Sequence, residues 1–224
     1  MKNIPPLLIV VCINLAFCSC SSRRAKNQNL PDLKPYVISD NQWNSPLLEK
    51  MLDYTVYSPD TLASKKPLVV YLKNLPGPQL GEFNDKALIN DFLEKEMMVI
   101  EVDYQGDPRA VAPDLLPEID LWHMYAFNSK DYPVDRDCIY ILPAGYTIDR
   151  NVRICEFENR PAEMDVIYPS GKTPCVPLMV QISYSRQPGM RINPGGAYYI
   201  FGLLTTGYAG AIMDYPGGGR APVI

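Results

Sequence analysis

Short apolar runs separated by polar turns dominate the sequence, and most of them have the length of a strand. The segment 146–157 alternates apolar and polar residues, which is typical of a half-buried antiparallel strand, and 163–168 is expected to pair with it. Further strands are expected at 52–57, which is rich in β-formers, and in the mainly apolar runs 67–72, 97–102, 138–142, 178–183 and 209–213.

Three segments have helical character. Asp85–Lys95 separates apolar from polar residues at helical spacing, and Asp85 is its expected N-cap. The segment 113–125 predicts a helix from Pro117 onward. Ala197–Thr206 predicts a short apolar helix that ends at Gly207.

The order strand, helix, strand occurs twice, and this predicts an α/β fold class with two βαβ-containing modules. Asp103-Tyr104 falls on Asp214-Tyr215 at an offset of 111 residues. Pro67-Leu68 falls on Pro177-Leu178 at an offset of 110. Two explanations fit this match: a true duplication, or the pattern that any two βαβ units share. Asp103 and Asp214 end their strands, and we expect them to order the following loops rather than to act in catalysis.

Composition narrows the function classes. The chain has 224 residues, of which 47% are hydrophobic and 21% charged, as in ordinary globular proteins. A net charge of −4 and a pI near 5.1 provide no basic surface for nucleic acid, so we exclude nucleic-acid binding as a primary role.

The N-terminus has the features of an export signal. Lys2 precedes the apolar stretch Leu7–Phe17, which is too short to span a bilayer. The sequence that follows resembles the cleavage site of bacterial lipoproteins, with Cys20 after the small Ser19 fitting better than Cys18. This resemblance implies an exported protein anchored to a membrane through lipid on Cys20, in the periplasm or on the outer-membrane surface. A plain secretory signal is the alternative.

These features divide the chain into four parts. Residues 1–20 form the signal, and the polar residues 21–35 form a linker. Residues 36–142 form an N-terminal α/β module, and residues 143–224 form a second module.

Three cysteines remain in the mature chain: Cys138, Cys155 and Cys175. They are expected to be mostly buried, with at most one disulfide. The chain has one histidine and no C-x-x-C motif after the signal, so we expect no metal and no cofactor.

The second module carries motifs of a known fold family. Asp165, Tyr168 and Pro169 fit a strand-ending turn, and Pro177–Val180 fits the start of the next strand. The later positions of the pattern are Gly207, Tyr208, Asp214 and Tyr215. In this order the segment resembles the N-terminal half of an α/β-hydrolase sheet, as in carbohydrate and acyl esterase lipoproteins of the Bacteroidetes type. The resemblance implies an oxyanion loop at Ser183 and Tyr184 and a carbohydrate ester as ligand.

The chain departs from this family in two places. Ser183–Arg186 replaces the glycine-rich oxyanion sequence, and no G-x-S-x-G nucleophile motif is present. The only histidine, His123, lies in a predicted helix and reads as a packed helical residue rather than a general base. We therefore assign no catalytic residue and expect a catalytically incomplete fragment of a serine esterase. The alternative is a complete non-catalytic lipoprotein that binds a glycan or a protein. The sequence sets no oligomeric state.

Overall fold

The computed structural model describes residues 37–59, 64–77, 82–128, 132–157, 160–171, 175–183 and 194–214. The predicted signal, the lipidation site at Cys20, the whole linker and Tyr184 lie outside the described residues.

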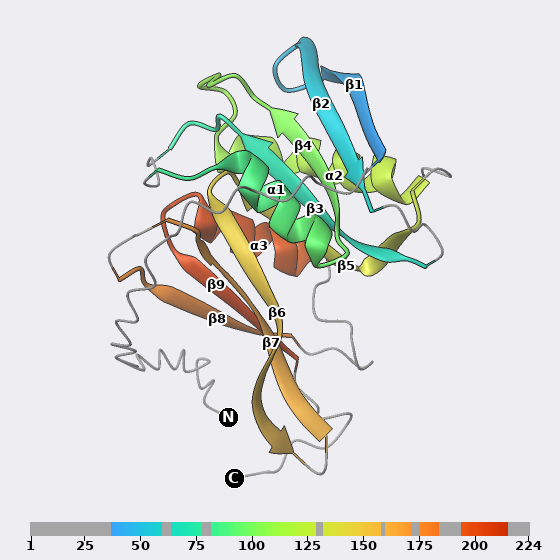
Figure 1. Ribbon diagram of the computed structural model, residues 1–224. Coiled ribbons are helices and arrows are strands. Elements are labelled where there is room, and N and C mark those ends of the chain that lie inside the picture. The colour runs from blue at the N-terminus through green and yellow to red at the C-terminus, as the bar shows by residue number, and fades with distance from the viewer. Residues whose placement is uncertain are drawn as a thin grey trace, which may run out of the picture. The chain divides into compact units, whose positions relative to one another are not determined.

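The first sheet has five strands in the order β1-β2-β4-β3-β5 (Figure 1). Strands β1 and β2 pair antiparallel, and β2 is antiparallel to β4. Strands β4, β3 and β5 run parallel, as buried apolar strands joined by helices do. The strand bounds are β1 Val37–Ser45, β2 Lys50–Ser58, β3 Lys66–Lys73, β4 Met98–Asp103 and β5 Val134–Pro143.

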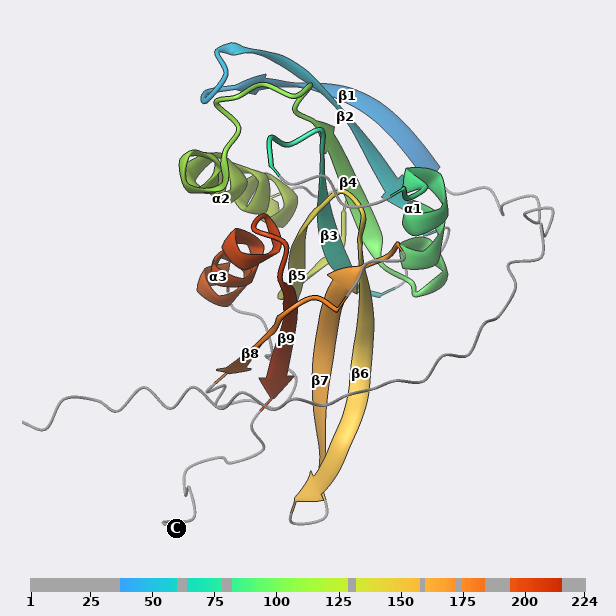
Figure 2. The same cartoon turned by 90° about the vertical axis from the view of Figure 1, so that its left-hand side faces the viewer.

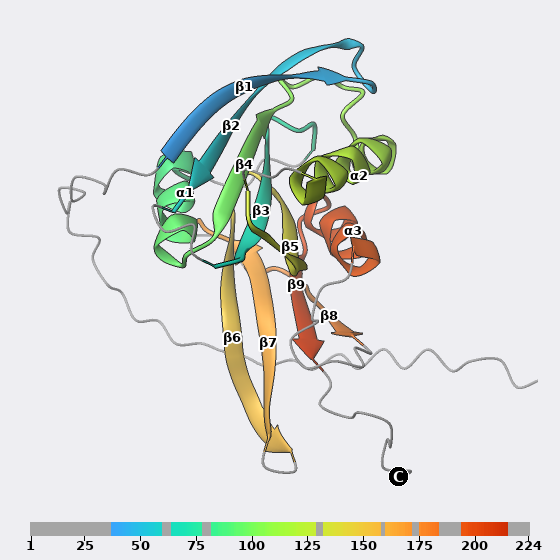
Figure 3. The ribbon, with the colours of Figure 1, turned by 90° about the vertical axis from the view of Figure 1, so that its right-hand side faces the viewer.

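Two helices cover the two faces of this sheet. Helix α1 (Asp85–Glu94) connects β3 to β4, and helix α2 (Ala112–Asn128) connects β4 to β5. Figures 2 and 3 show α1 on one side of the sheet and α2 on the other. The expected N-cap was wrong by one residue. Asn84 caps α1 by accepting a hydrogen bond from the Ala87 backbone N–H at 3.2 Å, and Asp85 is the first helical residue.

The second sheet has four strands in the order β6-β7-β9-β8. Strands β6 and β7 form the antiparallel pair that the sequence predicts, and β8 and β9 are the parallel pair of the second βαβ unit. Helix α3 (Pro194–Leu204) connects β8 to β9. The strand bounds are β6 Tyr146–Phe157, β7 Arg160–Pro169, β8 Leu178–Ser183 and β9 Ala209–Asp214.

The second sheet repeats the topology of the first. In both, an antiparallel hairpin is followed by a parallel strand–helix–strand unit, and the last strand inserts between the hairpin and the strand before the helix. A βαβ unit alone does not require the preceding hairpin. The likeness between the two halves therefore extends beyond the pattern that any two βαβ units share, which favours the duplication.

Helix α3 packs on both sheets. It contacts β8 and β9 of its own sheet, and also β5 and α2 of the first half. One hydrophobic cluster accordingly contains residues of both sheets, such as Leu142 of β5 and Ile212 of β9, which are 0% and 2% exposed. The Tyr146 hydroxyl donates to the Leu204 carbonyl at 2.8 Å and ties the turn after β5 to the end of α3.

Three sequence expectations were wrong. Strand β1 was missed, because its polar residues hide any alternation. Helix α2 begins at Ala112 and contains Pro117, because burial of Leu115 and Ile119 outweighs the hydrogen bond that proline removes. Cys138 is buried, but Cys155 and Cys175 are exposed, and all three thiols are free. Cys155 lies on the part of the β6–β7 hairpin that pairs with no third strand among the described residues.

Candidate functional site

The carboxyl ends of β3 and β5 surround a cavity of about 110 Å³. This edge of a parallel sheet is where open α/β folds bind ligands. The residues that line the cavity are Leu72, Lys73, Asn74, Leu75, Pro76, Gly77, Phe83, Asp85, Pro143, Ala144, Tyr146, Leu204 and Thr205.

The turn after β5 contributes Pro143 and Ala144 to the wall of this cavity. Here it reads Pro143-Ala144-Gly145-Tyr146 and offers neither a serine nor a cysteine. Gly145 has φ 87°, a conformation that glycine adopts without strain. The Ala144 N–H donates to the Leu72 carbonyl at 2.9 Å, and the Gly145 N–H donates to the Tyr71 hydroxyl at 2.9 Å. Both amide hydrogens of this turn are therefore already hydrogen bonded within the protein.

Tyr71 fixes the position of this turn through its hydroxyl group. Its side chain is 0% exposed, and its hydroxyl donates to Asp85 Oδ1 at 2.7 Å while accepting from Gly145. Burial, followed by the hydrogen bond to Asp85, raises the pKa of Tyr71 well above its usual range. The phenol therefore stays protonated and acts as a fixed structural link.

The electrostatic potential at the cavity also disfavours binding of a negatively charged oxygen such as an oxyanion. The cavity wall includes Leu204 and Thr205 at the C-terminal end of α3. A helix C-terminus carries partial negative charge, whereas acyl-transfer catalysis needs donors or a helix N-terminus at this place. The site therefore favours cationic or hydrogen-bond-donating groups.

A wider groove of about 680 Å³ adjoins this cavity and shares Lys73, Phe83 and Asp85 with it. It lies over the face of β2, β4 and β3 that α1 leaves open. Its other lining residues are Asp53, Thr55, Tyr57, Asn84, Lys86, Ile89, Glu101 and Asp103. The signal in the sequence is the alternation in β2, where Asp53, Thr55 and Tyr57 lie between buried residues.

Glu101 organises the floor of the groove. It accepts a hydrogen bond from the Tyr57 hydroxyl at 2.6 Å and pairs with Lys73 Nζ at 2.6 Å. Burial works against the charge on Lys73, but the contact with Glu101 prevails and raises its pKa. Burial, then the bond to Glu101, also raises the pKa of Tyr57. The groove thus presents acidic side chains, the charged Lys73 and the neutral phenol of Tyr57.

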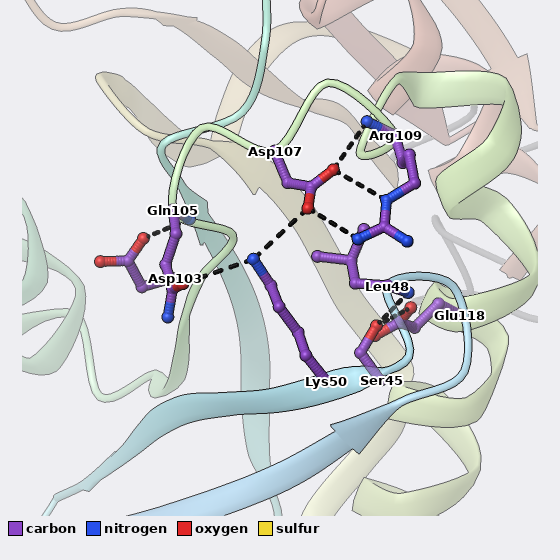
Figure 4. A network of polar contacts seen from close by, with 8 residues as sticks. All are labelled: Ser45, Leu48, Lys50, Asp103, Gln105, Asp107, Arg109 and Glu118. Atoms are coloured by element: carbon purple, nitrogen blue, oxygen red, sulfur yellow. Dashed lines mark hydrogen bonds and ion pairs between the residues drawn. The ribbon is translucent and has the colours of Figure 1, made fainter.

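Asp103 orders the loop after β4, as the sequence predicts. Its Oδ1 accepts from Asn74 Nδ2 and from the Gln105 backbone N–H, each at 2.7 Å. Further along the loop, Asp107 pairs with Arg109 at 2.9 Å and with Lys50 at 3.4 Å (Figure 4). The hydrogen bonds from Arg109 hold the pKa of Asp107 well below its usual range. The side chain of Asp214 lies outside the described residues.

The base of α2 is fixed to the turn between β1 and β2 by a second polar cluster. Glu118 is 2% exposed and accepts from the Ser45 hydroxyl at 2.7 Å, and Ser45 Oγ accepts from the Leu48 N–H at 3.0 Å (Figure 4). These contacts hold the hairpin that bounds the groove, so they support the site without entering it.

Asp165, a residue of the family-like motif, has a structural role. Its side chain is 0% exposed and accepts from the Tyr140 hydroxyl at 2.7 Å and from the Asn151 N–H at 2.9 Å. Arg150 Nε donates to the same Tyr140 hydroxyl at 3.0 Å. This buried network joins β5 of the first sheet to β6 and β7 of the second.

The structure does not bring the remaining predicted residues together as an active site. Ser183 ends β8 and pairs with Asp214 of β9, whereas Tyr184 lies outside the described residues, so the oxyanion-loop assignment stays a prediction. His123 is a packed residue of α2, as expected, and is 3% exposed. Its Nδ1 is hydrogen bonded to the Tyr198 hydroxyl of α3 at 2.8 Å. Burial lowers the pKa of His123 to about 4, so it is neutral at physiological pH.

Among the described residues, no three acidic, histidine or cysteine side chains lie close enough to hold a metal ion. The acidic residues of the groove are thus spread along its floor rather than gathered at one point.

Neither a protein-family model nor a curated protein matches this chain. Solved structures are similar to about half of it. A fungal esterase from Rhizomucor miehei is 18% identical over 50% of this chain and 35% of its own, with a TM-score of 0.36. An S-formylglutathione hydrolase from Agrobacterium tumefaciens is 12% identical over 48% of each chain, with a TM-score of 0.37.

A ferulic acid esterase is 17% identical over 48% of this chain and 50% of its own, with a TM-score of 0.32. This chain spans about a third of the length of the first structures it matches, 35%, 35% and 34%. The mixed α/β fold is thus similar, over about half of the chain, to esterases of the α/β-hydrolase fold.

Proposed function

We propose that this protein is an exported lipoprotein related to α/β-hydrolase serine esterases that act on carbohydrate or other acyl esters, and that the residues present here are catalytically incomplete. The observation that carries the proposal is the turn after β5. That turn stands where the nucleophile would be, yet Gly145 occupies it and donates its amide hydrogen to Tyr71.

The rest of the described chain supplies no substitute for the missing nucleophile and base. His123 is enclosed between α2 and α3 and bonds to Tyr198. In the second sheet, β8 has the position that β3 has in the first, but no described strand stands beside it as β5 stands beside β3. A nucleophile needs a base within hydrogen-bond reach. The Ser45 hydroxyl has such a partner in Glu118, but both side chains are buried and line neither the cavity nor the groove.

Hydrolysis of 4-nitrophenyl acetate and of feruloyl and acetyl sugar esters tests this proposal. A version that starts at Ser21 should release product no faster than buffer, and Ser183→Ala should change nothing. Turnover above background that Ser183→Ala or Ser185→Ala abolishes would overturn the claim of incompleteness.

The lipid anchor is the second part of the proposal. No helix in the described part of the chain is long and apolar enough to cross a membrane. The support comes from the N-terminal sequence, in which Ser19 precedes Cys20. Radiolabelled palmitate should enter the protein in a bacterial host and should be lost in Cys20→Ser but kept in Cys18→Ser. Absence of label in the wild-type protein would contradict the lipid anchor and would support a plain secretory signal instead.

The groove over β2, β4 and β3 favours a second candidate, a non-catalytic lipoprotein that binds a glycan. Sugar sites combine carboxylates and amides, which meet the hydroxyls, with aromatic faces for stacking. The groove offers Asp53 and Asp103 as acceptors, Lys86 as a donor, and Tyr57 and Phe83 as aromatic surfaces.

Calorimetric titration with a panel of neutral and amino-sugar oligosaccharides distinguishes this candidate. Binding that Phe83→Ala weakens by about fivefold or more would support it, since loss of a stacking contact costs on the order of 1 kcal/mol. Tyr199→Ala, at an exposed aromatic residue outside the groove, is the matched control. Absence of heat with every member of the panel would count against it.

A further inference from the structure

The two sheets have four edge strands in the described chain: β1, β5, β6 and β8. An unpaired edge is a template for pairing with another chain, and monomeric proteins protect such edges with charged side chains. Three edges carry this protection, for example Asp40 on β1, Arg136 on β5 and Arg153 on β6. Strand β8, Leu178–Ser183, contains no charged residue and no proline.

The side chains of β8 are exposed where those of its counterpart are buried. In β3, Leu68 and Val70 are each 0% exposed. The corresponding residues of β8, at an offset of 110, are Leu178 and Val180, which are 53% and 50% exposed. Strand β3 is flanked by β4 and β5, whereas β8 pairs only with β9 among the described strands. The sequence of β8 is therefore typical of a central strand that is buried on both faces, although β8 lies at the edge of the described sheet.

The exposed residues lie on the face of the second sheet opposite α3. Gly210 faces α3, since an added Cβ would lie 2.9 Å from Ile200. Met179 pairs with Gly210 and shares that face, because directly paired residues of neighbouring strands point the same way. Leu178 and Val180 alternate with Met179, so they point to the other side of the sheet.

We propose that the edge of β8 pairs with the same edge of a second copy of this chain, antiparallel about a two-fold axis, to form a continuous eight-stranded sheet. A two-fold contact brings each residue near its own copy or a close neighbour, so a charged edge would oppose like charges. Of the four described edge strands, β8 alone could pair with its own copy in this way without placing like charges opposite each other. The pairing would place Leu178 and Val180 of one copy next to the same residues of the other copy, across the two-fold axis.

This inference goes beyond the esterase relation and does not depend on it, because it rests only on the strands described here. Every described helix and strand lies between Val37 and Asp214, within the compact unit 33–224. A version that starts at Ser21 therefore keeps the whole described fold and removes the lipid as a cause of association.

Sedimentation equilibrium over a concentration series tests the proposal. The mass of the wild type should approach twice the monomer mass as the concentration rises to about 100 μM. At that concentration a dimer with a micromolar Kd is almost fully formed. Val180→Lys should weaken dimerisation about tenfold or more, because two ammonium groups replace an apolar contact at the axis. Ile154→Lys is the matched control: Ile154 is a 44% exposed β-branched residue on another edge strand, and the variant should remain a dimer.

Amide hydrogen exchange keeps the test decisive if a variant folds poorly. In the wild type, protection of the amides of residues 178–183 should rise with protein concentration, while protection in β1 should not. A wild type that stays monomeric would overturn the proposal. So would a dimer that Ile154→Lys dissociates and Val180→Lys does not, or concentration-dependent protection at β1 instead of β8.

Discussion

The Tyr71 hydroxyl accepts a hydrogen bond from the Gly145 backbone N–H at 2.9 Å and donates one to Asp85 at 2.7 Å. Through this single oxygen, the turn that follows β5 is tied to the middle of β3 and to the first turn of α1. These hydrogen bonds give the turn and the Tyr71 hydroxyl a structural role. The following predictions test that view and the packing around it.

Replacement of Tyr71 by phenylalanine should lower the free energy of unfolding by about 1–3 kcal/mol, since it leaves the buried Gly145 N–H without its acceptor. Urea unfolding measures the change. Tyr199→Phe is the control, because Tyr199 is 57% exposed and should change stability by less than about 0.5 kcal/mol. Equal losses in the two variants would contradict the role assigned to Tyr71.

Two glycines of the second half should respond in opposite directions to alanine. At Gly210 a new methyl group would lie 2.9 Å from Ile200, so Gly210→Ala should destabilise by about 1–3 kcal/mol. Gly202 lies in α3 with no atom within 4 Å of its added Cβ, and Gly202→Ala should stabilise by about 0.4–1 kcal/mol. Thermal unfolding of both variants decides the matter. A destabilised Gly202→Ala would show that the α3 surface is covered.

Stability should fall with acid through His123. Burial lowers the pKa of His123 to about 4 from a usual 6.5, so the unfolded chain takes up the proton first. This contribution is fully present above pH 6.5 and is lost as the pH falls towards 4. At pH 5 the loss is on the order of 2 kcal/mol. Urea unfolding at pH 7.5 and pH 5 should show this difference in the wild type.

His123→Gln separates this effect from the titration of carboxylates. The variant removes the ionisable ring, so its stability should change less between the two pH values, by about the same 2 kcal/mol. Identical pH dependence in wild type and variant would contradict the burial of a neutral imidazole between α2 and α3.

The buried network at Asp165 should matter more than any exposed acid. Asp165→Ala leaves the Tyr140 hydroxyl and the Asn151 N–H without their acceptor, and we expect a loss of about 3–5 kcal/mol. Asp53→Ala in the exposed groove should cost less than about 1 kcal/mol. Urea unfolding compares them, and a small loss at Asp165 would mean that the junction between the sheets is held by apolar packing alone.

The sequence predicted most elements, because buried strands and the amphipathic helix α1 carry strong local patterns. It failed at β1, where Asp40, Asn41 and Gln42 obscure the alternation, and this failure concealed the antiparallel hairpin of the first half. For this reason the sequence motifs indicate the family resemblance in the second half only. The structure shows the same strand order in both halves.

The candidate site was harder to predict because it depends on contacts distant in sequence. No local pattern indicates that Tyr71 meets Gly145, 74 residues away, or that Asp165 meets Tyr140. The groove combines residues of β2, β4 and α1 whose register only the folded sheet defines. By contrast, the loop-ordering role of Asp103 followed from its position at a strand end, and the structure confirms it.

The most direct test of catalytic incompleteness is covalent labelling with a fluorophosphonate, which reacts preferentially with an activated serine nucleophile. Intact-mass measurement of the folded protein from Ser21 onward, after incubation with excess reagent, should show the unlabelled mass alone. Addition of one phosphonyl group per chain that Ser183→Ala or Ser185→Ala prevents would contradict the account, because the chain would then contain a working nucleophile.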